Sequence, residues 1–448
     1  MRNSKPYVIA VTGLALFAMF FGAGNLIFPV MIGYQSGTNV LPAIVGFLLT
    51  GVLLPVFGII GSAREPDKVG GIADRIGRIP GKVLLIAIFL STGVLYAVPR
   101  VAAVSFEIGI APLIGDHQQL GLLIYSVIFF GLCFWLTFNE NRVVENIGAW
   151  LTPILLVFLI ILIINCVLRL ASAPLEPDPT YVDSPMLTGL LQGYFTMDAL
   201  AALVFGIVII TSLRRNGFDT KKKLFRATAL SGIIAGVCLA LVYLGLTAIG
   251  TRITGKEFDN GASGLAYAAS LMFGRSGQII FGLIAFFACL TTAVGLIGAS
   301  TSYFKTMYPK VPRKTMLIIH IAIALVLSNL GLTMILKIVA PLNQFIYPAA
   351  ICLIVLAVID WLIPGSFHWT YRLSAWTAAF IAFFDALWST NLPVFEGLGH
   401  FLNSLPGGPQ NMEWAPFTLV ALIIGLIIDA VQGRLTRANT PEAELSSN

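Results

Sequence analysis

The chain has 448 residues, of which 57% are hydrophobic and only 11% are charged. Ordinary soluble domains carry about 25% charged residues, so this chain has too little charge to cover a water-facing surface of its size. A membrane-spanning helix needs about 20 residues, and the apolar residues suffice for about a dozen such helices. The composition excludes a cytosolic enzyme, a disordered regulator and a disulfide-linked secreted domain, and it predicts an all-α integral membrane protein.

The formal net charge of +6 does not indicate a nucleic-acid partner. Basic residues lie in short clusters between long apolar runs, as the residues that determine membrane topology do. The five cysteines lie inside apolar runs without the spacing of metal ligands, and we interpret them as small buried hydrophobes. The first apolar run is too long for a signal peptide and has no small-x-small cleavage site after it, so we expect an uncleaved first span.

Apolar runs between charged and turn-forming clusters divide the chain into twelve segments, each long enough for a membrane-spanning helix. None of them alternates as the strands of a membrane β-barrel do. The predicted spans cover residues 8–32, 40–61, 83–104, 120–138, 147–168, 188–212, 227–250, 279–303, 315–336, 338–360, 373–392 and 415–431.

Lysine and arginine are unevenly divided between the two sides of this arrangement. With the connections assigned alternately, the side that carries both termini holds 21 of the 27 basic residues and the other side holds 6. Because basic residues favour the cytoplasmic side of a membrane protein, both termini are predicted to be cytoplasmic. The split also supports an even number of spans, since an odd number would scramble it. The polar tail, residues 432–448, is expected to be disordered.

The first predicted span is interrupted near its middle. Gly22, Gly24 and Asn25 lie within the apolar run, and Pro29 follows. These residues are unfavourable in an uninterrupted helix, whereas irregular backbone at this depth is tolerated where it lines a cavity. Close packing through small residues would explain the glycines without a site, but it does not explain the asparagine and the proline. We therefore predict a broken helix.

The sixth predicted span contains a carboxylate, Asp198. A charge within the membrane costs at least about 2.5–3.5 kcal/mol, so such residues generally have a partner or a function. The alternative is that Asp198 lies near the membrane surface. However, about twelve residues separate it from the start of the span, and twelve helical residues extend about 18 Å.

The two interruptions occupy the leading helices of two five-span blocks, residues 1–172 and 186–360, with two additional helices in residues 361–431. An odd number of spans in each block forces the second block to be inverted relative to the first. Broken helices at corresponding positions of inverted repeats indicate the central site of a secondary transporter, where helix N-termini attract an anionic group and freed carbonyls bind cations.

Several motifs resemble those of the branched-chain amino acid:cation symporter family, in order along nearly the whole chain. They are Phe17 to Pro29; Pro99-Arg100 with Val104 to Gly109; Gly193 to Asp198 with Val204 to Val208; and Ala288 to Leu290 with Thr292 to Leu296. The resemblance implies a secondary importer of leucine, isoleucine and valine in the cytoplasmic (inner) membrane of a bacterium. It implies symport with Na⁺ or H⁺ and no other cofactor. The oligomeric state and the preference among the three amino acids are left open.

The family is in turn similar to the leucine-transporter-type fold of five-plus-five inverted spans, and this likeness implies site residues. The implied substrate-binding residues are Gly22, Ala23, Gly24, Asn25, Phe195 and Asp198. The implied cation-binding residues are Ala18, Phe21, Ala288, Thr291 and Thr292, with Asn25 and Thr196 at a separate position, and they would hold Na⁺ if the transporter is sodium-coupled. Intrahelical hydrogen bonding is the alternative role for the two eighth-span threonines.

The seventh span departs from the wider fold because it contains no asparagine to complete the position at Asn25. Arg100, at the outer end of the third span, is a candidate gate or partner of Asp198, although its side chain can equally reach the membrane interface. Asp360 and Asp429 are expected to be solvated at span ends, and Asp385 has no assigned role.

Other classes of membrane protein fit less well. An enzyme would need a catalytic motif such as His-Glu-x-x-His or a nucleotide-binding glycine loop, and the sequence shows neither. A channel would usually show a filter or a charged ring, commonly with oligomer symmetry, whereas this sequence indicates a repeat within one chain. The main alternative is a cation symporter for another solute, such as another neutral amino acid, a purine or an osmolyte.

Overall fold

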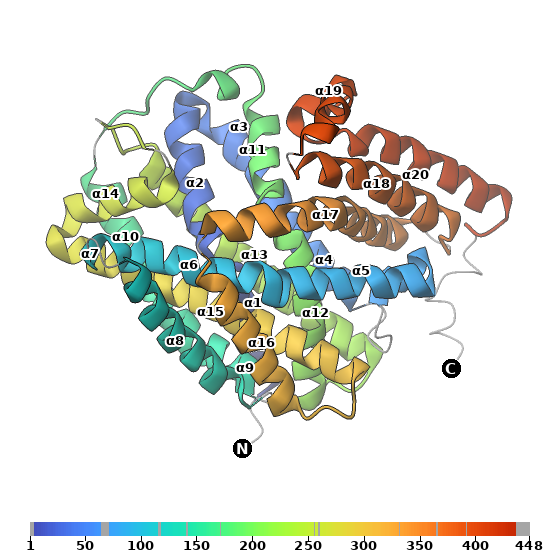
Figure 1. The fold of residues 1–448 in the computed structure, drawn as a ribbon, viewed down its shortest axis with the longest axis horizontal. Helices are drawn as coiled ribbons and strands as arrows, with labels where there is room; N and C mark the ends of the chain where they lie inside the picture. The colour runs from blue at the N-terminus through green and yellow to red at the C-terminus, as the bar shows by residue number, and fades with distance from the viewer. Residues whose placement is uncertain are drawn as a thin grey trace. The chain divides into compact units, whose positions relative to one another are not determined.

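The computed structural model describes residues 4–63, 71–114, 118–139, 142–170, 172–254, 256–258, 260–330, 332–363, 366–390 and 392–435. Throughout these ranges the regular secondary structure is helical, as Figure 1 shows. This confirms the all-α prediction. The predicted disordered tail lies outside the described residues from position 436 onward.

Within the described residues, eight helical segments are long and apolar enough to cross a membrane, or nine if one bent pair of helices counts as a single span. The predicted number of twelve exceeds this, and part of the difference has a simple cause. The first predicted span is divided at its break, which leaves α1 (Lys5–Phe20) too short to qualify alone. Residues from Ala23 to Ser62 instead form one continuous apolar stretch.

The chain forms two compact units, the first comprising Met1–Ala63 and Thr92–Ile335. Besides α1, the α-helices of this unit are α2 (Ala23–Ser36), α3 (Val40–Leu48), α4 (Leu54–Ser62), α6 (Ala97–Gly109), α7 (Ala111–Ile114), α8 (Gln118–Thr137), α9 (Val143–Glu145), α10 (Thr152–Arg169), α11 (Pro185–Tyr194), α12 (Asp198–Arg215), α13 (Lys221–Gly250), α14 (Gly261–Phe273), α15 (Arg275–Met307) and α16 (Arg313–Ser328).

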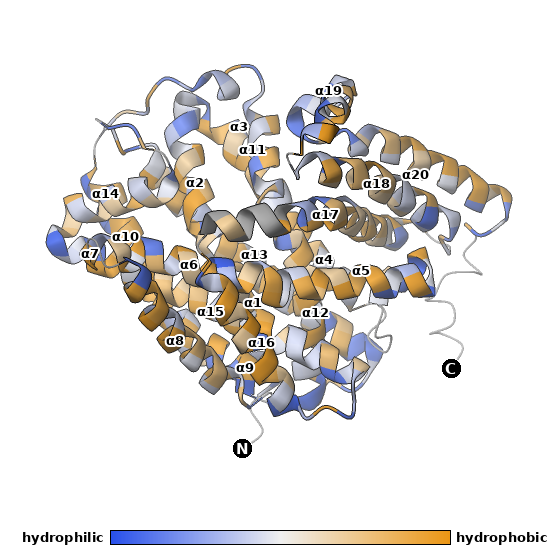
Figure 2. Cartoon of the chain, viewed as in Figure 1, coloured by the Kyte–Doolittle hydropathy of each residue, from blue (hydrophilic) through white to orange (hydrophobic). Residues whose placement is uncertain are grey.

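Helix α1 is the centre of the first unit and packs against α12, α13 and α15. Its second half is fully enclosed, with Leu16, Phe17 and Met19 at 0% exposure. The peripheral helices instead expose large apolar side chains, such as Trp135 on α8 and Leu241 on α13. Figure 2 shows this hydrophobic colouring along α8. An apolar coat around a buried core is what a bilayer requires of a spanning bundle.

Helices α2 and α13 approach each other unusually closely. A Cβ atom added to Gly33 would lie 2.1 Å from the carbonyl oxygen of Thr247, and one added to Gly250 would lie 2.1 Å from that of Val30. Only glycine fits at both positions, because any side chain would overlap the opposing backbone. This contact fixes the spacing of the two helices that carry Asn25 and Tyr243.

The second unit comprises Arg64–Ser91 and Leu336–Asn448. Its α-helices are α5 (Arg78–Leu90), most of α17 (Leu332–Leu362), α18 (Trp369–Trp388), α19 (Glu396–Ser404) and α20 (Trp414–Val431). Helices α18 and α20 pack along each other, and a hydrogen bond from the Ser91 hydroxyl to the Asn343 side chain joins the end of the unit's first segment to α17.

Two carboxylates of this unit were expected to be solvated, and that expectation is wrong. Asp429 is fully buried and accepts hydrogen bonds from three backbone N–H groups at the start of α18 and from the Thr370 hydroxyl. Asp360 is 8% exposed and lies 3.9 Å from the Arg75 guanidinium. Both are enclosed because each interacts with a partner in the same unit. Asp429 accepts from the N-terminus of α18, and Asp360 lies beside the positively charged Arg75 side chain.

Candidate functional site

The predicted break in the first span is present and lies between α1 and α2. Phe21 and Gly22 leave the helical conformation, and Gly22 is extended with φ −99° and ψ −166°. The irregular segment is shorter than expected, because Gly24 and Asn25 belong to the first turn of α2. The first backbone N–H groups of a helix have no partner within that helix, so α2 presents free donors and a positive dipole end at the break.

Pro29 adds a free acceptor to the same turn. A helical residue at position 29 would donate its N–H to the carbonyl oxygen of Asn25, and proline has no N–H to donate. The backbone carbonyl of Asn25 therefore lacks its usual helical partner. The polar side chain, the freed carbonyl and the free amides all lie within one turn of the break.

The sixth span is also broken, between α11 and α12. The two helices meet at an angle of 44°, and Met197 between them has a left-handed conformation with φ 62°. Such a conformation in a non-glycine residue costs of order 1 kcal/mol or more and is concentrated at functional sites. Asp198 is the first residue of α12, where its carboxylate faces the positive end of the helix dipole.

The two breaks are joined through side chains. The Nδ2 atom of Asn25 donates to Oδ2 of Asp198 at 2.6 Å and to the hydroxyl of Tyr243 on α13. Thr196 also hydrogen-bonds the Asp198 side chain, and its hydroxyl lies 2.8 Å from the carbonyl oxygen of Gly193. Asn25 and Asp198 are only 4% and 6% exposed, so this polar group is enclosed in the middle of the unit and not at its surface.

The predicted eighth-span oxygens face the first break. Oγ1 of Thr291 lies 2.8 Å from the carbonyl oxygen of Ala18, 2.9 Å from that of Ala288 and 3.0 Å from that of Phe287. Oγ1 of Thr292 lies 3.5 Å from the Ala18 oxygen. The contacts to Phe287 and Ala288 lie within α15 and are the intrahelical alternative, which coexists with the contact to α1. Hydroxyl and carbonyl oxygens thus converge here, which is the chemistry that hard cations prefer.

Gly22 connects the two groups of residues. A Cβ atom at this position would lie 3.2 Å from Oγ1 of Thr292, so the break in the first span and the threonine pair are in near contact. Phe21, the other predicted residue of the break, directly precedes Gly22 and stacks on Phe17 with ring centroids 5.4 Å apart.

Two predicted residues are less closely placed. Phe195 lies in the second break, half-buried, with its ring against Tyr194. The guanidinium of Arg100 on α6 donates to the Tyr96 hydroxyl at 3.0 Å and lies over that ring. The described contacts of Arg100 are therefore with Tyr96, one turn earlier, and its role as a gate or partner of Asp198 stays a prediction.

Three residues at this site were not found from the sequence. Tyr243 bonds Asn25, and Cys289 on α15 receives a hydrogen bond from the backbone N–H of Ala23 and contacts the Ser105 side chain. Sulfur is a weak acceptor, so a carboxylate would compete well for the N–H of Ala23. Tyrosine, cysteine and serine are tolerated in apolar helices, and nothing in their spacing distinguishes these three from others.

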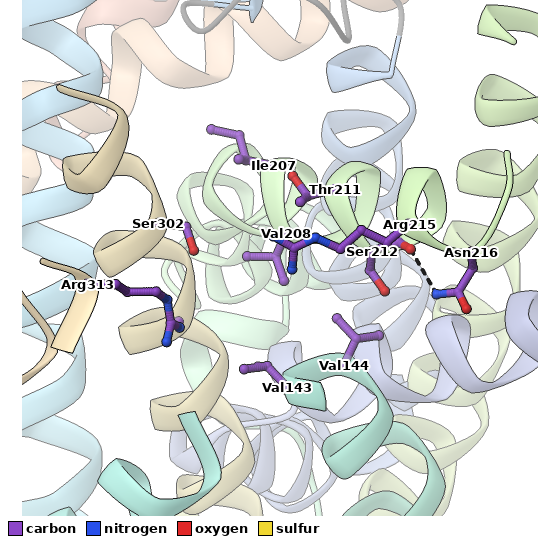
Figure 3. Close-up of a pocket in the computed structure, with 11 residues that line it drawn as sticks. Val143, Val144, Ile207, Val208, Thr211, Ser212, Arg215, Asn216, Ser302 and Arg313 are labelled. Atoms are coloured by element: carbon purple, nitrogen blue, oxygen red, sulfur yellow. Dashed lines mark hydrogen bonds between the residues drawn. The ribbon is translucent and has the colours of Figure 1, made fainter. Parts of the chain in front are cut away.

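A separate pocket lies farther along α12 and α15. Thr211, which lines it, is thirteen residues after Asp198, or about 20 Å along the helix. Figure 3 shows the side chains of Arg215 and Arg313 reaching toward this pocket. Other residues of its lining are Val143, Val144, Ile207, Val208, Ser212, Asn216, Gly298 and Ser302. The pocket is distinct from the buried group at the breaks, although α12 and α15 contribute to both; α9 and α16 complete its lining.

Solved structures with a similar fold are membrane transporters. A crystal structure of a mutant of the Eremococcus coleocola manganese transporter has a TM-score of 0.54 at 14% identity, covering 94% of this chain and 95% of that one. A nucleobase-cation-symport-1 family transporter, in a closed conformation with bromovinylhydantoin bound, has a TM-score of 0.52 at 13% identity, covering 93% and 91%. These likenesses show a helical fold that is shared with membrane transporters, and paired broken helices around enclosed polar groups are typical of that fold.

The sequence relatives identify the family. The profile described as "Branched-chain amino acid transport protein" matches residues 5–432. The branched-chain amino acid permease BrnQ of Corynebacterium glutamicum is 41% identical over 426 residues, covering 95% of this chain and 96% of the relative. A putative branched-chain amino acid carrier protein of Staphylococcus aureus is 34% identical over 444 residues, covering 95% and 97%. The chain belongs to the branched-chain amino acid transport protein family, and it is a multi-pass membrane transporter and not an enzyme.

Proposed function

We propose that the protein imports leucine, isoleucine and valine across the cytoplasmic membrane of a bacterium, driven by symport with Na⁺ or H⁺. The single observation that carries this proposal is the meeting of the two helix breaks with the threonine pair of α15. This meeting brings hydrogen-bond donors for an anion, a carboxylate and converging oxygens into one enclosed region. The names of the relatives supply the class of substrate.

The substrate end of the site matches the groups of a zwitterionic amino acid. The N–H groups of Ala23 and Gly24 at the start of α2 would bind the carboxylate, which would displace the weaker Cys289 sulfur from the Ala23 N–H. Asp198 would pair with the ammonium group. An aromatic cluster, defined as Phe21, Phe47 and Tyr243, lies beside the break with ring centroids 5.3 to 6.2 Å apart. These buried rings offer an apolar surface for a branched side chain.

The cation end would use the oxygens of Ala18, Phe21, Ala288, Thr291 and Thr292, with Asn25 and Thr196 at a separate position. These groups supply neutral oxygen ligands without burying a second charge, which suits a monovalent cation. If H⁺ is the coupling ion, Asp198 would carry it, because this carboxylate is enclosed and held by Asn25 and Thr196. Transport would proceed by rocking of helices around the fixed site.

The pocket at Arg215 and Arg313 would belong to the cytoplasmic end of the pathway. It lies at the end of α12 beside a strongly basic connection, residues 214–226, and basic connections favour the cytoplasmic side. With both termini on that side, the breaks would lie between this pocket and the outer face.

A different solute remains the second candidate, because transporters with a similar fold carry unlike cargoes: one is a manganese transporter and another belongs to the nucleobase-cation-symport-1 family. Uptake of labelled leucine into proteoliposomes containing the purified protein distinguishes the two. We expect unlabelled isoleucine and valine to compete with leucine, whereas alanine and uracil do not. Leucine uptake no greater than in protein-free liposomes would exclude the proposed substrate.

A further inference from the structure

The side-chain amide of Asn25 is held from two sides. An asparagine amide has two N–H hydrogens, and here both have acceptors, one on Asp198 and one on Tyr243. With its nitrogen committed in this way, the side-chain oxygen Oδ1 is the group left to face a ligand. The backbone carbonyl of the same residue is freed by Pro29. Asn25 therefore offers two oxygens, and the direction of Oδ1 depends on the two hydrogen-bond partners of the amide.

The hydroxyl of Tyr243 is a fixed acceptor. Tyr243 is fully buried, and its ring lies 5.3 Å from Phe47 and 6.2 Å from Phe21, measured between centroids. The close approach of α13 to α2 at Gly33 and Gly250, about two turns beyond, holds the two backbones together. A tyrosine whose ring and backbone are both confined cannot follow Asn25 if the amide rotates.

We propose that the Tyr243 hydroxyl is the positioning group that orients Asn25 toward the coupling ion. The proposal rests on the proposed function. It adds a role for Tyr243 in the seventh span, which contains no asparagine to complete the position at Asn25. Tyr243 would act through Asn25 and would not touch the ion. Without the Tyr243 hydroxyl oxygen, one N–H of the Asn25 amide loses its acceptor. The amide can then rotate and place its nitrogen, in place of Oδ1, where an oxygen ligand of the ion is needed.

The Tyr243→Phe variant tests this role, because it keeps the ring and removes the acceptor. A buried hydrogen bond contributes about 0.5–1.5 kcal/mol, so the ion concentration for half-maximal leucine uptake should rise about three- to tenfold. If the ion is H⁺ carried by Asp198, a released amide no longer donates steadily to the carboxylate, so protonation becomes easier and the pH of half-maximal uptake should rise by about 0.5–1 unit. The leucine KM at saturating ion should change less than about twofold, since Asn25 acts on the ion.

Two control variants separate the hydroxyl from the ring and from general effects. In Tyr181→Phe the lost hydroxyl is buried without a hydrogen-bond partner among the described residues, so uptake and its ion dependence should remain those of the wild type. Phe47→Leu loosens the ring packing of Tyr243 but keeps its hydroxyl. Because Phe47 belongs to the proposed substrate surface, this variant is assayed without leucine, by the ion dependence of its protection against thermal unfolding. That dependence should stay within about twofold of wild type, and a larger shift would assign the effect to packing.

A double-mutant cycle with Asn25→Ala tests whether Tyr243 acts through Asn25. Adding Tyr243→Phe to Asn25→Ala should change the half-activating ion concentration less than about twofold, because the orienting bond is already absent. Ion-dependent protection of the purified proteins against thermal unfolding is measured in parallel, since it requires folding but not turnover. Wild-type ion dependence in Tyr243→Phe, or independent effects in the cycle, overturns the proposal. Absence of leucine uptake by the wild type would instead refute the proposed function.

Discussion

Thr292 illustrates how one side chain links the two halves of the site. Its hydroxyl lies 3.5 Å from the Ala18 carbonyl and in near contact with Gly22 at the break. It is 8% exposed and belongs to a long helix that also carries Cys289. A hydroxyl placed in this way can bind a cation only while the break stays next to α15, so ion affinity and the conformation of the break should be coupled.

Thr292→Ala should lower the affinity for the coupling cation. Hydrogen bonds and ligand contacts to charged groups contribute about 1.5–3 kcal/mol, so we expect the half-activating cation concentration to rise about tenfold or more. The measurement is leucine uptake into proteoliposomes over a range of cation concentrations. Thr228→Ala is the matched control, because that buried hydroxyl on α13 has no hydrogen-bond partner among the described residues. Equal cation dependence in both variants would remove Thr292 from the cation site.

Asp198→Asn should abolish accumulation of leucine. The variant keeps the shape of the side chain but loses the charge that would hold the ammonium group or carry a proton. It is measured as the ratio of internal to external leucine under an imposed gradient. Asp183→Asn, a change at an exposed carboxylate, should accumulate leucine as the wild type does. A normal ratio in Asp198→Asn would place the central site elsewhere.

The residues that stood out in the sequence did so because they are costly in an apolar helix. Gly22, Asn25 and Asp198 were identified for that reason, and the structure brings all three to the breaks. Tyr243 and Cys289 carry no such cost, so only the spatial meeting of distant helices reveals them. The roles of all these residues in binding stay predictions.

At the scale of helices, the breaks in the first and sixth spans were predictable and their extents were not. A glycine pair and a charge show that a helix is interrupted, but which residues leave the helix depends on packing against neighbouring helices. Gly24 and Asn25 thus join α2, whereas Met197 takes the strained left-handed conformation. The burial of Asp429 could not be predicted either, because its partners lie about sixty positions earlier in the chain.

Asp429→Asn should destabilise the α18–α20 pair. The Asp429 carboxylate caps α18 by accepting from the backbone N–H groups of His368, Trp369 and Thr370 at 2.9 to 3.1 Å. An asparagine can accept with only one oxygen, and loss of a cap costs about 0.5–2 kcal/mol. Thermal unfolding of the purified protein in detergent measures the loss. The exposed Asp219→Asn is the control, and an unchanged unfolding temperature in Asp429→Asn would show that the cap contributes nothing.

Glu413, just before α20, should make stability depend on pH. Its burial, together with the hydrogen-bonded Asp385 carboxyl, raises the pKa of Glu413 from 4.5 to about 8. Between these two values the folded protein holds a proton that the unfolded chain releases. This contribution to stability is therefore complete below pH 4.5 and is lost as the pH rises through about 8.

The measurement is the unfolding temperature of the wild type and of Glu413→Gln across this pH range. Glutamine stays neutral and can donate to Asp385, so the variant should lose less stability between about pH 5 and about pH 8.5 than the wild type. Glu396→Gln, at an exposed position, should follow the wild type. Parallel curves for Glu413→Gln and wild type would contradict the assignment.

At the scale of the whole molecule, composition and loop charge carried most of the prediction. They predicted a helical membrane protein and an orientation. The fold likeness supports the helical architecture, and the family shows the membrane transport class. The number of spans could not be counted from hydropathy alone, because breaks and continuous helical stretches change what counts as one span. The inverted repeat, the orientation and the coupling ion stay predictions.

The central claim is that an ion gradient drives leucine accumulation through the site at the two breaks. The most direct measurement is uptake of labelled leucine into proteoliposomes under separately imposed inward Na⁺ and H⁺ gradients, with wild type and Asp198→Asn side by side. We predict that one gradient drives the wild type to accumulate leucine above the external concentration, while the variant does not exceed it. Accumulation that is independent of both gradients, or equal in the two proteins, would contradict the account.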